Sequence, residues 1–195
     1  MDSQDKRYQR THARIRQVFE ELVQTESFRD ITVSSVSRRA GINRKTFYMH
    51  YESTTQLLNE MVEEIVREVQ ACEAEYRGTD GFCGAGMMEG FFRVLARREA
   101  LHRRLICSPE YLFAFQMVTD SLARQSSCTD AAPLQLDSFR QRVVTTFLTG
   151  SVMQIYRDWL ISGKPISEQE LARFLERLMQ GCLQGISEGQ NCPKL

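Results

Sequence analysis

The chain has 195 residues, of which 42% are hydrophobic and 26% are charged, and its mean hydropathy is −0.37. This composition is typical of a soluble globular protein of one or two domains, and it excludes the ~18–20-residue apolar run that a membrane-spanning helix needs. The net charge is zero, yet residues 1–50 hold ten Lys and Arg against six Asp and Glu. A basic end on a neutral chain predicts an anionic partner at that end.

The first fifty residues show the periodicity of short amphipathic helices. A stripe with the spacing i, i+3, i+4, i+7 predicts a helix over about 8–25. The residues of this stripe are Ile15, Val18, Phe19, Leu22 and Val23. Thr32 is a favourable N-cap for a second helix, and Gly41 can adopt the positive φ that ends it.

A third helix follows at once, because Asn43 is again a good N-cap. We expect it to run from Arg44 to about Tyr51, with Phe47 and Tyr51 buried four residues apart. The remaining face carries basic, aromatic and hydroxyl side chains. Its members are Arg44, Lys45, Thr46, Tyr48 and His50.

The rest of the chain is also predicted to be helical. Ser53 or Thr54 can cap a long fourth helix, and Ser167 with Glu170 three residues later forms a capping box for the last one. Glycine-rich and small polar sequences predict loops at 78–86 and 125–133. We expect helices at about 54–76, 85–98, 99–107, 109–126, 136–162 and 167–187. The sequence therefore predicts an all-α fold of about nine helices.

Motifs for catalysis and metal binding are absent from the sequence. The six cysteines are scattered without a CxxC pair, the three histidines are far apart, and no nucleophile-elbow, zinc-protease or phosphate-loop motif occurs. We expect reduced thiols, no metal, no cofactor and no enzymatic activity. The polar N-terminus lacks the apolar core of a secretory signal, so we expect a cytoplasmic protein with no membrane partner.

Two short helices joined by a glycine turn have the layout of a helix-turn-helix. Buried Phe47 and Tyr51 would anchor the second helix so that its other face can enter a DNA major groove. Arg44 and Lys45 can donate to guanine edges, whereas Thr46 and Tyr48 can reach the backbone. The alternative is an ordinary three-helix bundle with a solvated basic face.

The span Thr32–Leu58, T-x-x-x-V-S-R-R-A-G-I-N-R-K-T-F-Y-M-H-Y-x-x-x-x-x-L-L, resembles the DNA-binding signature of the TetR family of bacterial transcriptional regulators. Thr54 departs from the resemblance, because many members carry a phosphate-contacting lysine there; we expect weaker binding by about one ionic contact. For His50, a packing role is the alternative to a phosphate contact. The resemblance implies DNA-facing positions at Ser34, Ser35, Arg44, Lys45, Thr46, Tyr48, His50 and Thr54.

The resemblance further implies two domains and a homodimer. Residues 1–53 would form the helix-turn-helix DNA-binding domain, and residues 54–195 a larger helical domain for ligand binding and dimerisation. Two copies would bind a palindromic double-stranded operator, and an unknown small molecule would release or modulate them. Repression is the commoner mode in such families, so we expect a repressor.

A second hypothesis is a ligand-dependent co-activator that uses its helix-turn-helix to bind a protein partner. The pattern W-L-x-x-G-K-P-x-S-x-x-E-L, at 159–171, is similar to a subgroup that includes regulators related to the dihydroxyacetone-kinase activator. Retention of the basic face favours DNA binding over this alternative.

Candidate residues in the larger domain come from apolar clusters, which are alternatively no more than hydrophobic core. For a ligand pocket they are Met88, Phe91, Phe92, Phe113, Met117 and Tyr156. For a dimer interface built by the two last helices they are Leu148, Val152, Ile155, Trp159, Leu171, Phe174, Leu175, Leu178 and Cys182.

Overall fold

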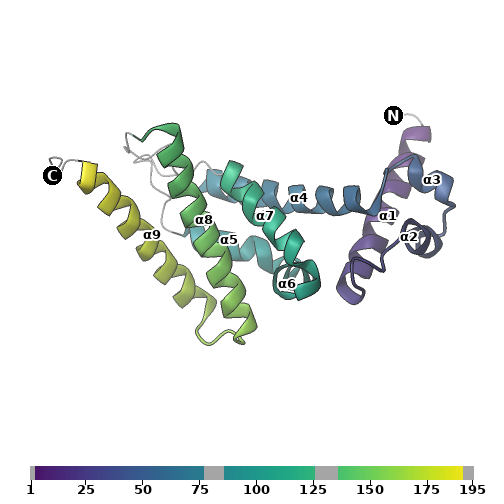
Figure 1. Cartoon of the computed structure of the whole chain (residues 1–195). Helices are drawn as coiled ribbons and strands as arrows, with labels where there is room; N and C mark the ends of the chain where they lie inside the picture. The colour runs from purple at the N-terminus through teal and green to yellow at the C-terminus, as the bar shows by residue number, and fades with distance from the viewer. Residues whose placement is uncertain (1–2, 77–85, 126–135, 191–195) are drawn as a thin grey trace. The chain divides into compact units, whose positions relative to one another are not determined.

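The structure, a computed structural model, describes residues 3–76, 86–125 and 136–190 (Figure 1). Every regular element in these ranges is a helix, which confirms the predicted all-α fold. The predicted loops at 78–86 and 125–133 lie outside the described residues, apart from Gly86 and Gln125. In chain order the helices are α1 (Ser3–Thr25), α2 (Val33–Ala40), α3 (Arg44–Tyr48), α4 (Thr54–Glu75), α5 (Met87–Ala96), α6 (Glu99–Cys107), the 3-10 helix η1 (Pro109–Tyr111), α7 (Leu112–Gln125), α8 (Ser138–Ile161) and α9 (Glu168–Gln190).

The chain divides by its contacts into two compact units. The first comprises Met1–Glu63 and Ala100–Phe115, and the second comprises Glu64–Glu99 and Gln116–Leu195. Helix α4 begins in the first unit and ends in the second. No helix among the described residues has the length and hydrophobicity needed to span a bilayer.

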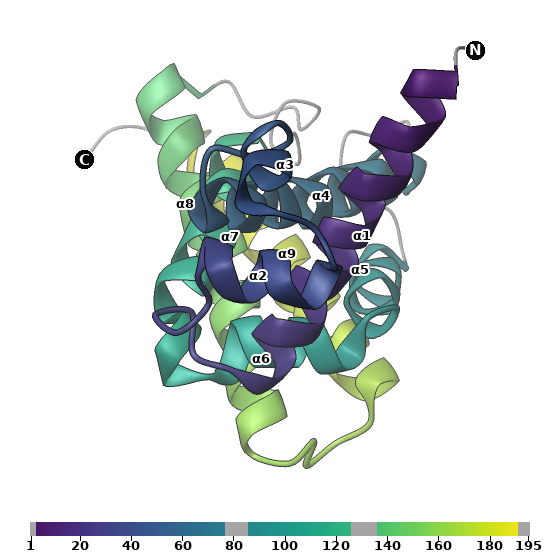
Figure 2. The ribbon, with the colours of Figure 1, turned by 90° about the vertical axis from the view of Figure 1, so that its right-hand side faces the viewer.

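In the first unit, α1 packs on α2 and α2 packs on α3 (Figure 2). The predicted stripe of α1 is buried, with Ile15 and Phe19 fully enclosed. Helix α1 starts at Ser3 rather than near residue 8, because the polar segment before the stripe consists largely of good helix formers. This extension is not visible in the apolar periodicity.

Helix α2 begins and ends with the predicted caps. The Thr32 hydroxyl accepts a hydrogen bond from the Ser35 backbone N–H at 3.1 Å, and the Ser35 hydroxyl accepts one from the Thr32 N–H at 3.0 Å. Gly41 lies in the left-handed region at φ +69°, which gives a Schellman ending with Ile42 N–H donating to the Ser37 carbonyl. The chain therefore reverses tightly before α3.

Helix α3 is shorter than the sequence predicts. Its regular part ends at Tyr48, and Met49 and His50 form a turn in which the Tyr51 N–H still donates to the Phe47 carbonyl at 3.0 Å. Tyr51 is nevertheless buried, as expected, because this turn returns the chain to the core. The prediction of a helix up to Tyr51 was wrong by about one turn.

The first unit also contains the end of α6 and the start of α7. Fully buried Tyr111 donates a hydrogen bond to the Glu26 carbonyl, just beyond α1, at 3.0 Å. Burial raises the pKa of this phenol to about 12, so it stays a donor at neutral pH. Arg104 lies over the Tyr111 ring and pairs with Glu110 at 2.6 Å. These contacts fix the turn between α1 and α2.

In the second unit, α5 takes its N-terminal cap from another helix. Its N-cap residue, Gly86, has no side chain, and one carboxylate oxygen of Glu176 on α9 accepts hydrogen bonds from the Gly86 and Met88 N–H groups at 2.7 and 3.2 Å. The predicted capping box of α9 is present, with the Glu170 N–H donating to the Ser167 hydroxyl at 3.2 Å. Helix α5 is thus fixed by α9.

Gly90 places α5 directly against α4. A Cβ at this position would collide with the sulfur of Cys72 and would lie 2.7 Å from the Tyr76 ring. Since both atoms belong to side chains of one neighbouring helix, the two helices can approach this closely only with glycine at position 90.

We expect Gly90→Ala to destabilise the protein by about 1–3 kcal/mol, because overpacking forces neighbouring side chains out of their positions. Urea denaturation followed by circular dichroism measures this loss. Adding Cys72→Ala removes one of the colliding atoms and should restore part of the stability. A Gly90→Ala protein at least as stable as the parent would contradict the assignment.

Candidate nucleic-acid interface and ligand pocket

The exposed face of α3 is set by the burial of one ring. Phe47 is 0% exposed, whereas Tyr48 is 51% exposed and Arg44 and Lys45 also face solvent. The Arg44 guanidinium lies 3.5 Å from the Tyr48 hydroxyl, one helical turn away. Helix α3 therefore presents two cations and a phenol on the side opposite its buried ring.

The hydroxyls expected at this surface differ in their surroundings. The Ser35 hydroxyl donates to the Thr32 carbonyl at 2.9 Å and completes the cap of α2, while that of Thr46 donates to the Asn43 carboxamide oxygen at 3.0 Å and joins the cap of α3. Ser34 is exposed, and Thr54 is half-buried at the first residue of α4. Two of the four thus shape the helices as well as the surface.

His50 packs against α1. Its ring centroid lies 4.1 Å from that of Tyr8, and its Nδ1 atom is buried without a hydrogen-bond partner. Burial, followed by the nearby charge of His12, lowers the pKa of His50. This environment fits the packing role that the sequence left open beside a phosphate contact.

Beside His50 lies a polar network that joins α1, Tyr51 and α4. The Tyr51 hydroxyl lies 3.1 Å from His12 Nε2, which in turn lies 3.5 Å from the Glu60 carboxylate. Arg16 approaches the same carboxylate at 3.5 Å. Burial and then the Glu60 charge raise the pKa of Tyr51 well above its usual value. The sequence analysis missed this network, because its members are far apart in the chain.

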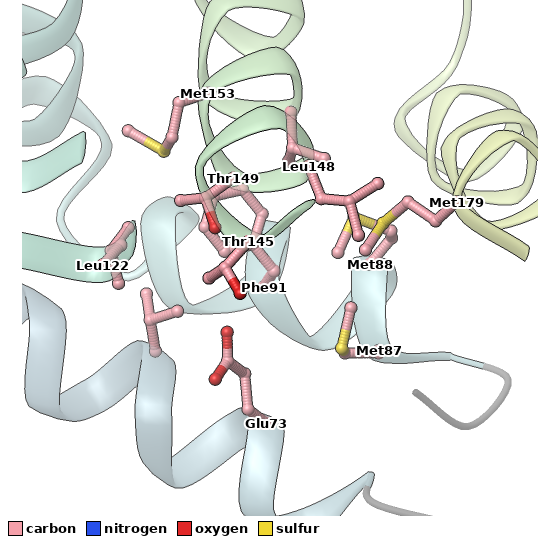
Figure 3. A pocket seen from close by; sticks show the side chains of 12 residues that line it. Glu73, Met87, Met88, Phe91, Leu122, Thr145, Leu148, Thr149, Met153 and Met179 are labelled. Atoms are coloured by element: carbon pink, nitrogen blue, oxygen red, sulfur yellow. The ribbon is translucent and has the colours of Figure 1, made fainter. Parts of the chain in front are cut away.

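A cavity of about 40 Å³ opens in the second unit (Figure 3). Of the six residues predicted for a pocket, Met88 and Phe91 line it. Phe92 and Tyr156 stack beside it, with ring centroids 4.9 Å apart. Phe113 is exposed in the first unit, where it contacts Phe28, and Met117 is half-buried on α7. The structure brings Glu73 to the cavity wall, a residue that the apolar pattern did not indicate.

The residues predicted for a dimer interface fall into two groups. Phe174 and Leu178 are exposed, and Ile155 and Cys182 are half-buried. The remaining five are at most 7% exposed and belong to the core of the subunit: Leu148, Val152, Trp159, Leu171 and Leu175. Large apolar side chains that the prediction omitted are exposed on α8, namely Phe139, Val143 and Phe147.

Neither a metal site nor a reactive thiol is evident in the described part of the chain. No group of three or more His, Cys, Asp or Glu side chains is placed to hold a metal ion there. Burial raises the pKa of the Cys72 thiol, which disfavours the thiolate. Cys83, Cys128 and Cys192 lie outside the described residues.

Comparison with known proteins by sequence gives one short match. No protein-family model matches the chain. Over 66 residues it is 32% identical to the uncharacterized HTH-type transcriptional regulator YxbF of Bacillus subtilis, which covers 33% of this chain and 17% of that protein. The matched segment therefore spans less than a fifth of the relative.

Solved structures match over nearly the whole chain. A TetR transcriptional regulator from Streptococcus agalactiae is 20% identical with a TM-score of 0.67, covering 90% of this chain and 97% of that one. The TetR-family repressor AlkX from a Dietzia strain gives 18%, 0.54, 89% and 97%, and the dihydroxyacetone kinase operon activator DhaS gives 17%, 0.55, 89% and 96%. The chain has the fold of the TetR-family regulators.

We expect acid to weaken folding through His50. Because its pKa is lowered from 6.5 in the folded protein, the unfolded chain binds protons more readily near that pH, and stability falls as pH decreases through it. The free energy of unfolding in urea at pH 7.5, 6.5 and 5.5 should decrease with a shallower slope in His50→Gln. An unchanged slope would show that His50 titrates as it does in water.

Proposed function

We propose that the chain is a DNA-binding transcriptional regulator that binds a palindromic operator as a homodimer, acts as a repressor, and responds to a small molecule bound in its second unit. The observation that carries this proposal is the exposed basic and aromatic face of α3, held by a buried ring behind a glycine turn. The shared fold with TetR-family regulators supports it.

In this proposal α3 is the recognition helix. A five-residue helix presents about one and a half turns, so few side chains can reach base edges. Arg44 and Lys45 are suited to guanine O6 and N7, and the exposed Ser34 hydroxyl on α2 is suited to phosphate. Thr46, Tyr48 and Thr54 would make backbone contacts. Sequence preference is therefore assigned to the two cations.

A homodimer is supported by the apolar surface of the last two helices. Phe139, Val143 and Phe147 follow one another at i, i+4 and i+8 on α8 and are 51–63% exposed, and Phe174 and Leu178 are similarly exposed on α9. Such a surface is costly in water and marks an interaction site. Two copies joined there would hold two α3 helices for adjacent major grooves, about 34 Å apart along a palindrome.

We expect Arg44→Ala and Lys45→Ala each to lose about 1–3 kcal/mol of specific binding, because a bidentate contact to guanine is worth that much. Selection of bound duplexes from a random pool identifies the operator, and fluorescence anisotropy at two salt concentrations measures its affinity. Arg103→Ala removes an equal charge from an exposed site on α6 and serves as the control.

Each result of that experiment decides between the two candidate functions. An enriched palindrome whose affinity falls in both α3 variants, and not in the control, supports the regulator. If no sequence is enriched and weak binding vanishes in modest salt, the proposal fails. A ligand-dependent co-activator that binds a protein partner then takes its place, a role to which the shared fold with an operon activator also lends support.

We expect Leu178→Glu to shift the protein from dimer to monomer, since a charge in the centre of an apolar interface must be desolvated. Sedimentation velocity measures the change, and operator affinity should fall by at least tenfold with it. Leu112→Glu introduces the same charge at an exposed leucine of the first unit and should leave the dimer intact. A dimeric Leu178→Glu protein would exclude this face.

A further inference from the structure

The cavity in the second unit has walls that can move. Three methionines from two helices line one side of it, Met87 and Met88 on α5 and Met179 on α9 (Figure 3). Methionine is unbranched and has three rotatable bonds, so it adapts to the shape of an occupant. At about 40 Å³ the cavity now holds no more than a few water molecules. A ligand must therefore be slender and must displace methionine side chains.

One carboxylate lies in this otherwise apolar wall. Glu73 projects from α4, and its carboxylate points toward Thr145 and Phe91 (Figure 3). The Thr145 hydroxyl donates its proton to the Gln141 carbonyl at 3.0 Å, so it can only accept from an occupant. The described lining contains no Lys, Arg or His. The polar side of the cavity is thus negative and rich in acceptors.

The charge of the wall discriminates among ligands. An anionic ligand would be repelled by the Glu73 carboxylate in a site of low polarity. A neutral ligand would displace water from that carboxylate and offer little in return. A cationic group that donates hydrogen bonds would replace the lost water and pair with the charge.

We propose that this cavity binds a slender apolar molecule with one positive charge, an alkylammonium or arylalkylammonium ion, with Glu73 as its counter-ion and the methionines around its apolar part. The proposal rests on the proposed function in one respect, that the second unit binds the effector. It adds the chemical class of that effector, which the fold does not specify.

Helix α5 connects this ligand to α9. Met87 and Met88 belong to the first turn of α5, the turn that Glu176 of α9 caps through the Gly86 and Met88 N–H groups. A ligand that displaces these methionines must therefore move or strain the cap. Glu176 lies between Phe174 and Leu178 on α9, so the strain reaches the helix that carries the proposed dimer surface.

The test uses three probes of equal chain length: octylammonium chloride, octan-1-ol and sodium octanoate. Isothermal titration calorimetry on the full chain at pH 7 measures their affinities. The single tryptophan, Trp159, reports independently, because its ring stacks on Phe92 at 6.2 Å and Phe92 neighbours Phe91 of the lining at 5.6 Å. We expect octylammonium to bind at least tenfold more tightly than octan-1-ol, and octanoate to bind most weakly.

Glu73→Gln should weaken octylammonium binding by about 10- to 100-fold, the range for losing a charged hydrogen bond, and should leave octan-1-ol binding unchanged. Retained octan-1-ol binding shows that the variant is folded. Glu75→Gln removes the same charge from an exposed site on α4 and should change neither affinity.

Octanoate binding as tight as octylammonium, an unchanged preference in Glu73→Gln, or no binding by any probe would each overturn the proposal. These outcomes are separate from the fate of the proposed function, because operator selection needs no ligand. Probe binding without any effect on operator affinity would keep the cation site and reject its regulatory role. An operator found without probe binding would do the reverse.

Discussion

The burial of Phe47 is the constraint on which the candidate DNA-binding surface depends. A helix of five residues is not stable alone, since nucleation costs more than so few hydrogen bonds return. Helix α3 exists because Phe47 is enclosed in the first unit and because Gly41 turns the chain into position. The directions of Arg44 and Lys45 follow from that single anchored ring, so the chemistry of the surface depends on the core behind it.

The second unit depends in a similar way on α5, which cannot be understood from its own sequence. Its N-cap residue is a glycine without a side chain, its cap comes from Glu176, and Gly90 allows it to touch α4. Methionines of its first turn line the cavity. The cavity, the cap and the exposed face of α9 are therefore neighbours, which gives an occupant of the cavity a short physical path to the proposed dimer surface.

Local signals in the sequence predicted helices well, because they act between residues close in the chain. Thr32, Asn43 and the pair Ser167–Glu170 cap helices where the sequence placed them, with hydrogen bonds that span three residues. Helix ends without such a signal were predicted less well. The end of α3 depends on the return of Tyr51 to the core, and the start of α1 lies in a polar segment with no apolar period.

The sequence by itself determined the all-α class, most helix bounds, and the basic, aromatic face of residues 44–48, because periodicity and caps are local properties. Only the tertiary structure decided what each apolar face covers. Leu148 and Trp159 share the periodicity of Phe147, yet they are buried within the subunit and Phe147 is exposed. It also placed His50 against Tyr8, joined Tyr51 to Glu60 through His12, and brought Glu73 to a cavity of methionines. These contacts join residues distant in the chain, and side-chain spacing along one helix carries no information about its neighbours.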